Sequence, residues 1–511
     1  MFVKLLMLVV FFAIMIGVGL YTRKHTTSVD GFVLGGRSVG PWLTAFAYGT
    51  SYFSAVVFVG YAGQFGWKYG LASTWIGIGN AVIGSLLAWV VLGRRTRIMS
   101  QHLNSKTMPD FFGERYQSKS IKIVASAIVF IFLVPYTASV YNGLSRLFGM
   151  AFNIPYSLCV IIMAVITGVY VILGGYMATA INDFIQGIIM LFGIVAVIAA
   201  VLNGQGGFIE AIRKMAEIPS DVPITMGQQG AFTSFFGPDP LNLLGVVVLT
   251  SLGTWGLPQM VHKFYAIKDE KAINTGTVVS TLFAVVISGG CYFLGGFSRL
   301  FDDPAIYDVQ SGAVVYDSIV PFMLSKLPDI LIGIVVVLVL SASMSTLSSL
   351  VLTSSSTLTL DFLKETVMKK MDEKKQVLTM QVLIVFFILL SVVIALDPPT
   401  FIAQLMGISW GALAGAFLAP FMYGLYWKGV TRAAVWASFA AGVGITVSNM
   451  VFKYIASPIN AGAIAMIAGL VVVPVVSLIT PKIQNEKLDK MFECYEEKVL
   501  VTQKRALETE R

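Results

Sequence analysis

Charged side chains are scarce in this sequence. Asp, Glu, Lys and Arg make up only 12% of its 511 residues, against about 25% in a typical soluble domain. The chain also has three cysteines, Cys159, Cys291 and Cys494, which are too few for a disulfide framework. We interpret the first two, which lie in apolar runs, as small buried hydrophobic residues. These shortages exclude a water-soluble globular protein and a disulfide-stabilised scaffold.

Apolar residues take the place of the missing charge. Hydrophobic residues make up 56% of the chain, the mean hydropathy is +0.81, and the 48 glycines suit membrane helices. Continuous apolar runs of about 20 residues match the thickness of a bilayer. They exclude a disordered or fibrous chain and a β-barrel, whose strands alternate. The sequence therefore predicts an all-α polytopic protein of a plasma or inner membrane. Its thirteen runs span residues 2–22, 42–65, 71–93, 123–148, 156–175, 181–202, 241–261, 273–297, 329–359, 378–396, 399–422, 431–452 and 460–480.

The basic residues predict the orientation of the chain, because Lys and Arg in loops favour the cytoplasmic side. With the N-terminus outside and the C-terminus in the cytoplasm, 27 of the 35 basic residues lie inside. The first run is expected to remain as a helix, because no small-residue cleavage site precedes Arg23. The net charge of +8 is spread over short loops, which indicates membrane lipid and not nucleic acid as the partner.

Few titratable groups fall inside the predicted helices. Asp183, at the start of the sixth run, is the main exception, and His25, His102 and His262 lie in loops or at run ends. A proton-coupled carrier places a carboxylate or a histidine in mid-membrane as a relay, so the sequence disfavours proton coupling. It also disfavours an intramembrane enzyme, because no Lys, His or Asp in mid-membrane is available to activate a serine.

The ninth run is rich in hydroxyl groups between residues 341 and 357. Hydroxyl and free carbonyl oxygens are hard ligands that suit hard cations. Small hydroxylated residues also let membrane helices pack closely and bond to their own backbone. The spacing alone leaves both interpretations open, with packing ahead.

Two runs carry residues that interrupt a helix. The second run gathers Gly, Thr and Ser at 48–54, and the seventh contains Gly253, Gly256 and Pro258. Pro258 has no N–H and frees a carbonyl one turn earlier. A broken helix exposes carbonyls to a cation and a positive N-terminal end to an anionic group. Two interrupted runs, five runs apart, predict a binding site near the middle of the membrane.

Five segments together resemble the sodium:solute symporter family, which includes sodium/proline, sodium/pantothenate, sodium/sialic acid and sodium/glucose carriers. The resemblance covers about residues 1–480. Its most specific parts are the Gly-Gly-aromatic element with its following Asp and Gln, and the Met-Ser-Thr element. The segments are LGGRSVG (34–40), MPDFF (108–112), GGYMATAINDFIQG (174–187), MSTLS (344–348) and WKGVTR (427–432).

The resemblance implies a leucine-transporter-type fold, with two inverted five-helix repeats in one transmembrane domain. A monomer is expected to suffice for transport. The implied divisions are a domain at 1–480, with a leading helix at 2–22, repeat one at 42–202, repeat two at 241–422 and trailing helices at 431–480, followed by a cytoplasmic tail at 481–511.

The resemblance also implies a sodium site between the broken second helix and the ninth helix. Asp183 matches the family's acidic residue on the sodium exit route, and it can also cap the sixth helix by accepting backbone N–H bonds. The implied sodium ligands are the carbonyls of Thr50, Phe53 and Ala342 and the hydroxyls of Ser345 and Thr346.

A solute pocket is implied among the second, third, fourth, seventh and eleventh helices, with no Arg or Lys in it. Tyr52, Val57 and Ser251 replace the polar contacts of the sugar carriers, and each sugar hydroxyl buried unpaired would cost about 1–3 kcal/mol. Tyr52 also replaces an aspartate of the proline carriers. The motifs are most similar to the pantothenate and monocarboxylate branch. By position the lining is Tyr52, Ser54, Val57, Phe58, Thr74, Tyr136, Ser251, Thr254, Trp255 and Gln404.

The sequence therefore predicts a sodium-coupled secondary active symporter, not an enzyme. It would import a small organic solute of carboxylate or amino acid type by alternating access, with Na⁺ as the coupling ion. Two alternatives remain: a sodium symporter for proline, a sugar or sialic acid, and a transporter-like membrane sensor. The tail after Pro481 contains no output domain that would favour the sensor.

Overall fold

The protein is built from helices. The computed structural model describes residues 2–22, 28–483 and 486–501, and these residues form no β-strand. The long helices are α1 (Phe2–Thr22), α3 (Pro41–Tyr52), α8 (Lys119–Phe152), α9 (Tyr156–Gly204), α11 (Pro240–Gly256), α13 (Glu270–Gly295), α15 (Asp329–Thr357), α17 (Glu373–Leu396), α18 (Ile402–Tyr426), α19 (Arg432–Phe452), α20 (Pro458–Ile479) and α21 (Glu486–Val501).

Shorter elements join and continue them. These are α2 (Val29–Leu34), α4 (Ala62–Tyr69), α5 (Thr74–Gly79), α6 (Arg94–His102), α7 (Met108–Arg115), α10 (Phe208–Glu217), α12 (Pro258–Ala266), α14 (Tyr316–Ser325) and α16 (Lys364–Thr366), with π-helical stretches η3 (Val56–Tyr61), η5 (Asn80–Leu87), η6 (Trp89–Gly93) and η11 (Leu358–Leu363).

Each of the thirteen predicted runs coincides with helix in the structure. By length and composition, ten described helices can cross a membrane, or eleven if the bent pair α11 and α12 counts as one span. The remaining runs lie in shorter helices or in helical stretches that join two predicted runs, such as 56–102, which overlaps the runs 42–65 and 71–93. The all-helical membrane class is confirmed, whereas the number of crossings and their orientation stay predictions.

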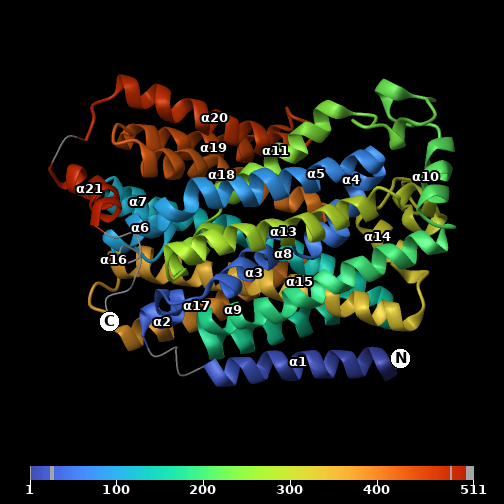
Figure 1. The fold of residues 1–511 in the computed structure, drawn as a ribbon, viewed down its shortest axis with the longest axis horizontal. Helices are drawn as coiled ribbons and strands as arrows, with labels where there is room; N and C mark the ends of the chain where they lie inside the picture. The colour runs from blue at the N-terminus through green and yellow to red at the C-terminus, as the bar shows by residue number, and fades with distance from the viewer. Residues whose placement is uncertain (1, 23–27, 484–485, 502–511) are drawn as a thin grey trace.

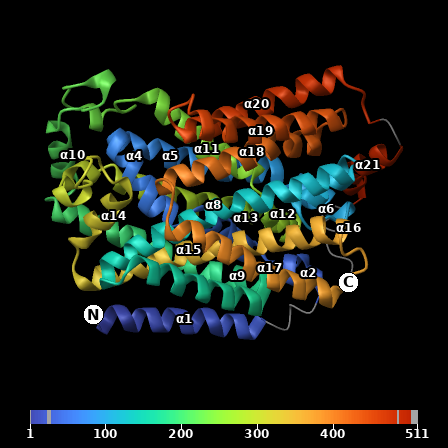
Figure 2. The same ribbon diagram turned by 180° about the vertical axis from the view of Figure 1, so that it is seen from behind.

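The helices run roughly along the long axis of the molecule (Figures 1 and 2). In both views α1 lies along one side and α20 along the other, with α3 and α15 between them. Helices α4, α10 and α14 lie at one end, which we call the outer end after the predicted orientation. The opposite end, with α6, α7, α16 and α21, is the inner end.

Burial separates the central helices from those that face lipid. Among the described membrane-length helices, α15 and α18 are the most buried, and α1 and α17 are the least. Large apolar side chains are exposed on the helices at the periphery of the bundle, as with Val9 (65%), Phe192 (77%) and Val393 (69%). A bilayer stabilises this arrangement. Cys159 and Cys291 are buried, as expected, and Cys494 is also buried.

Both predicted helix breaks are present. Helix α3 ends at Tyr52, Phe53 is extended (φ −113°, ψ 100°), and the chain resumes as the π-helix η3. Helix α11 ends at Gly256, Leu257 is extended, and α12 starts at Pro258 with a bend of 45°. Proline suits the first position of a helix because the N–H it lacks would have no partner there. Each break leaves backbone carbonyls outside a regular helical ladder.

A third irregularity lies in α9, where Gly175 has φ 54° and ψ −150°. A side chain at this φ is strained, and a Cβ there would lie 2.9 Å from the Phe32 carbonyl oxygen. The kink separates the two predicted runs 156–175 and 181–202, which the structure joins into one bent helix.

Asp317 on α14 connects the outer end to α18. The residue is 1% exposed, its carboxylate accepts the Ile402 N–H at 3.2 Å, and the Arg146 guanidinium lies 3.9 Å away. Burial raises the pKa of Asp317 to about 6, although Arg146 partly offsets this effect.

We expect Asp317→Asn to remove a pH-dependent loss of stability. A raised pKa means that the protonated form is favoured in the folded protein, so stability is highest below pH 4 and falls as the pH rises to about 6. The full difference is at most ~3 kcal/mol. Thermal unfolding from pH 4 to pH 8 should show this fall in the wild type and in exposed Asp397→Asn, but not in Asp317→Asn. Equal pH profiles in all three proteins would contradict the prediction.

A candidate cation and solute site at the helix breaks

Hydroxyl groups of α15 meet the end of α3. The Ser345 hydroxyl donates to Thr50 Oγ1 at 2.7 Å. The Thr346 hydroxyl lies 3.3 Å from the carbonyl oxygens of both Thr50 and Ser51, and 3.1 Å from that of Ala342. All five residues are buried. Three hydroxyls and three carbonyls therefore converge where α3 loses its helical ladder.

Two other serines of α15, Ser343 and Ser348, behave differently. The Ser343 hydroxyl bonds to the Val339 carbonyl, and the Ser348 hydroxyl bonds to the Ser345 carbonyl, both within the same helix. That is the pattern expected of packing residues. Ser345 and Thr346 instead reach across to another helix, which is the arrangement expected if they share a ligand with it.

Four of the five predicted sodium ligands are thus joined by hydrogen bonds: Thr50, Ala342, Ser345 and Thr346. The fifth, Phe53, is fully buried at the break itself, and its N–H still bonds to the Gly49 carbonyl at 3.2 Å. Their assignment as sodium ligands stays a prediction.

A buried lysine borders this cluster. Lys263 of α12 is 2% exposed, and its ammonium donates to the Ser349 hydroxyl at 3.0 Å. Ser349 lies 2.8 Å from the Ser51 hydroxyl. Asp183 of α9 has its carboxylate 3.9 Å from the Lys263 ammonium, and it is also a close neighbour of Ser345. One cation and one anion therefore flank the hydroxyls of α3 and α15.

The sequence interpretation of this region was wrong in two places. The predicted seventh run ends at residue 261, which puts His262 at a run end and Lys263 in a loop, but both are buried in α12, and the His262 ring lies 5.3 Å from that of Tyr176. Asp183 lies well inside α9, and no backbone N–H in the described part of the chain donates to its carboxylate. It does not cap a helix.

The signal for the buried lysine was present in the sequence. Pro258 restarts a helix, and Val261, Phe264 and Tyr265 then continue an apolar face at helical spacing. Proton coupling and an enzyme were disfavoured because the predicted helices contain no Lys or His in mid-membrane. Lys263 and His262 are both buried in α12, so this reason no longer holds. The family assignment below carries the functional conclusion without it.

Part of the predicted solute lining gathers where α11 packs on α5 and η5. The Tyr52 hydroxyl donates to the Thr250 carbonyl at 2.6 Å, and a Cβ at Gly84 would collide with that hydroxyl. Three neighbours from α11 bond to the facing helix: Ser251 to Asn80 Oδ1 at 3.2 Å, Thr254 to the Gly84 carbonyl at 3.1 Å and Trp255 to the Ile83 carbonyl at 2.9 Å.

The other predicted lining residues are placed less uniformly. The Tyr136 ring packs edge-on against Trp410, 5.9 Å between centroids, and Trp410 also stacks on Tyr52. Thr74 and Gln404 are half-buried and form no hydrogen bond with the Tyr52 group in the described residues. Ser54, Val57 and Phe58 are buried at the break or just after it.

The structure adds residues that sequence reasoning missed. Asn80 and Trp410 belong to the same group of contacts, and the buried Tyr61 hydroxyl has no hydrogen-bond partner in the described part of the chain. An unpaired buried hydroxyl is available to a solute.

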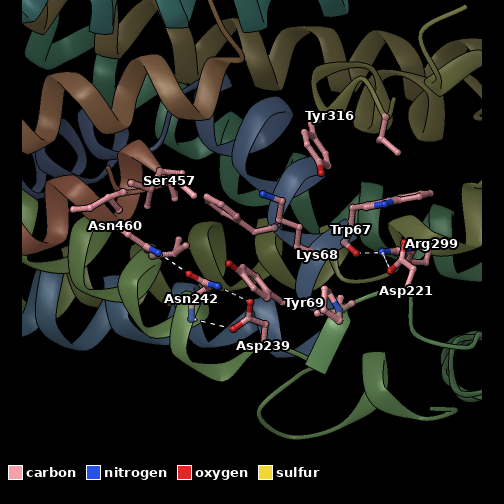
Figure 3. Close-up of a pocket in the computed structure, with 18 residues that line it drawn as sticks. Trp67, Lys68, Tyr69, Asp221, Asp239, Asn242, Arg299, Tyr316, Ser457 and Asn460 are labelled. Atoms are coloured by element: carbon pink, nitrogen blue, oxygen red, sulfur yellow. Dashed lines mark hydrogen bonds and ion pairs between the residues drawn. The ribbon is translucent and has the colours of Figure 1, made fainter. Parts of the chain in front are cut away.

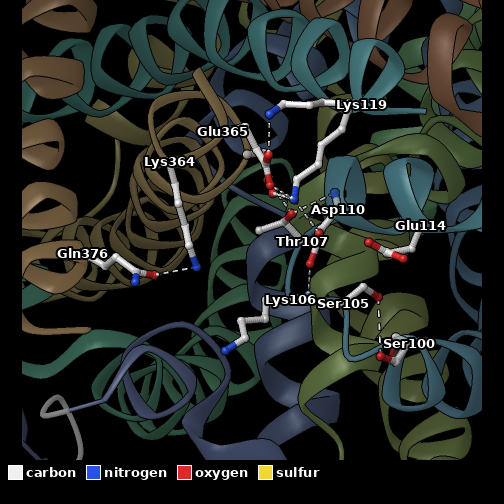
Figure 4. Close-up of polar contacts among 12 residues, drawn as sticks. Ser100, Ser105, Lys106, Thr107, Asp110, Glu114, Lys119, Lys364, Glu365 and Gln376 are labelled. Atoms are coloured by element: carbon white, nitrogen blue, oxygen red, sulfur yellow. Dashed lines mark hydrogen bonds and ion pairs between the residues drawn. The ribbon is translucent and has the colours of Figure 1, made fainter. Parts of the chain in front are cut away.

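An ionic cluster closes the inner end (Figure 4). The Lys122 ammonium lies 2.8 Å from Asp110, 3.2 Å from Glu365 and 3.7 Å from Asp361. Thr107 donates to Asp361 at 2.5 Å. Because Asp361 and Glu365 continue from α15, this inner cluster ties the hydroxyl-bearing helix to α7 and α8.

The fold is that of a multi-pass helical membrane protein with two broken helices. A family profile described as the sodium:solute symporter family matches residues 32–442. The chain belongs to the sodium:solute symporter family.

Known proteins support both the family and the fold. The chain is 29% identical over 503 residues to a sodium/proline symporter of Staphylococcus aureus, which covers 94% of this chain and 93% of that protein. A structure of a Na⁺-coupled sialic acid symporter in a substrate-bound outward-open state superposes with a TM-score of 0.75 at 15% identity, over 95% of this chain and 99% of that one. A nucleobase-cation-symport-1 family transporter gives 0.53 at 13% identity, over 90% and 98%. The leucine-transporter-type fold is confirmed.

Proposed function

We propose that the protein is a sodium-coupled symporter that imports a small organic solute of carboxylate or amino acid type by alternating access. The observation that carries the proposal is at the end of α3, where the Ser345 hydroxyl meets the Thr50 hydroxyl and the Thr346 hydroxyl meets the Thr50 and Ser51 carbonyls. Oxygen donors without net charge suit a hard monovalent cation that must also be released.

Sodium is a transported ion in this proposal. The carbonyls of Thr50, Phe53 and Ala342 and the hydroxyls of Ser345 and Thr346 would hold it. Asp183 is a close neighbour of Ser345 and would receive the ion on its way inward. There sodium would take the place of the Lys263 ammonium as the cation beside the Asp183 carboxylate. Inward movement of one charge supplies ~2.3 kcal/mol per 100 mV of membrane potential.

The organic solute would bind beside this site, among Tyr52, Ser251, Thr254 and Trp255. The lining offers aromatic faces, hydroxyls and the Asn80 amide, which suits a compact solute with one or two polar groups better than a sugar. The sodium/proline relatives favour an amino acid, and the motif pattern favours a monocarboxylate or pantothenate. Binding of ion and solute to one conformer would make each strengthen the other.

Uptake into proteoliposomes tests the proposal directly. An inward sodium gradient should drive accumulation of at least one of proline, pantothenate, short monocarboxylates, sialic acid or a sugar, and a potassium gradient should not. Binding of one of these solutes without any uptake would favour the sensor alternative and contradict symport.

The inner cluster is expected to hold the inward gate closed. Lys122→Met leaves Asp110 and the buried Asp361 without a neighbouring cation and Glu365 with Lys119 alone, so we expect a loss of about 2–4 kcal/mol of stability and a several-fold fall in uptake. Lys119→Met is the matched control, because Lys119 is 54% exposed and, among the described residues, pairs only with Glu365. It should change stability by at most about 0.5 kcal/mol. Equal effects of the two variants on thermal unfolding would contradict the gate.

A further inference from the structure

A cavity lies at the outer end of the molecule (Figure 3). Its volume is about 660 Å³, and it lies between α4, the start of α11 and the start of α20. Phe65, Trp67 and Tyr69 give it aromatic walls, and Val246 lies at its border one turn before Thr250, whose carbonyl accepts the Tyr52 hydroxyl. Helix α11 therefore connects this outer cavity to the candidate solute site.

One ion pair in the outer cavity is already neutralised. Arg299 forms two hydrogen bonds with Asp221, at 2.7 and 2.9 Å. Its guanidinium also donates to the Trp67 carbonyl at 2.7 Å and lies 4.2 Å from the Trp67 ring and 4.4 Å from the Phe232 ring. All of these contacts fix Arg299 as part of the wall.

Two further charges are not neutralised. Among the described residues, no carboxylate lies within 4 Å of the Lys68 ammonium, which lies 5.1 Å from the centre of the Tyr316 ring. Asp239 has no cation within that distance in the same residues, but the two groups are close enough to interact electrostatically. Lys68 and Asp239 are both half-buried.

Asp239 is held in place by neighbours that carry no charge. Its carboxylate accepts the Asn242 N–H at 3.2 Å and the Asn242 amide at 2.6 Å. Asn460 in turn donates to the Asn242 side chain at 2.6 Å. Asp239 is a fixed anion and Lys68 is a cation, and both line the same aromatic-walled cavity at a separation too large for a direct ion pair. This arrangement complements a small molecule that carries both charges.

We propose that the outer cavity binds a small zwitterion, with its carboxylate at Lys68 and its ammonium at Asp239 beside the aromatic walls. As an entry site for the transported solute it rests on the proposed function, and it narrows the solute class to amino acids or betaines. Binding in the outer cavity itself does not require sodium, because the sodium site lies deeper, where α3 meets α15.

The test uses one reporter thiol in the full-length purified protein. The three native cysteines are buried, so Ser457→Cys, at a cavity-lining serine that makes no capping hydrogen bond, provides a single reactive site. L-proline, glycine betaine and β-alanine are the zwitterionic probes, with acetate and ethylammonium as singly charged controls. At least one zwitterion, at several times its dissociation constant, should slow thiol labelling about fivefold, without sodium, whereas the singly charged probes should not.

Further variants separate this site from the sodium site. Protection should be lost in Lys68→Met and in Asp239→Asn, and it should persist in Ser345→Ala with Thr346→Ala, whatever those changes do to transport. A reporter at exposed Gln310 should show no protection. Failure of all three zwitterions to protect, equal protection by acetate, or unchanged protection in Lys68→Met would each overturn the proposal.

Discussion

Replacing Ser345 and Thr346 together by alanine should abolish most sodium-dependent stabilisation of the purified protein. The Thr346 hydroxyl meets the carbonyls of Thr50 and Ala342, and the Ser345 hydroxyl meets the Thr50 hydroxyl beside them. Each lost ligand bond is worth about 1–1.5 kcal/mol, so the sodium concentration for half-maximal stabilisation should rise about 30- to 160-fold. Thermal unfolding over a sodium titration, at constant ionic strength with potassium, measures this shift.

Ser343→Ala is the matched control for the double variant. Ser343 is equally buried on α15, but its hydroxyl bonds only to the Val339 carbonyl of its own helix. Its removal should leave the sodium titration within about twofold of the wild type, since no ligand is lost. A double variant with wild-type sodium dependence would refute the ligand assignment, and an equal loss in Ser343→Ala would show that packing and not ligation is being measured.

Lys263→Met should make the protein less stable without sodium and more responsive to it. The substitution leaves the Asp183 carboxylate buried without its cation at 3.9 Å, a change that typically costs about 3–5 kcal/mol. A sodium ion at the neighbouring hydroxyls would partly offset the unpaired Asp183 carboxylate, so sodium should restore more stability than in the wild type. Sodium titrations followed by thermal unfolding give both quantities.

A double-mutant cycle separates the pair from general damage. Combining Lys263→Met with Asp183→Asn removes both charges, so stability without sodium should recover most of the loss. The enhanced response to sodium should disappear with it, because no uncompensated carboxylate remains. Additive losses in the double variant would mean that Lys263 and Asp183 do not act on one another.

Much of the architecture could be predicted because its signals are local. Continuous apolar runs fix the helices, and the clusters at 48–54 and 253–258 fix the two breaks that the structure contains. Ser345 and Thr346 could not be distinguished from packing serines by spacing alone. The difference lies in which helix accepts their hydrogen bonds, and that depends on how α3 and α15 pack.

The charges of the interior were harder to predict, because their environment comes from distant parts of the chain. The sequence predicts Lys263 in a loop, because its contacts with Asp183 of α9 and Ser349 of α15 form only when these helices pack together. In the outer cavity, Lys68 and Asp239 come from segments far apart in the sequence. A sequence states that a charge exists, but its neighbours decide whether it pairs with another group or remains open to a ligand.

The most direct test of this account is a high-resolution density map of the protein in saturating sodium, compared with one in potassium. The account predicts a sodium-specific ion among the Thr50, Phe53 and Ala342 carbonyls and the Ser345 and Thr346 hydroxyls, with the break after Tyr52 retained. An ion bound elsewhere, or α3 continuing as an unbroken helix away from α15, would contradict it.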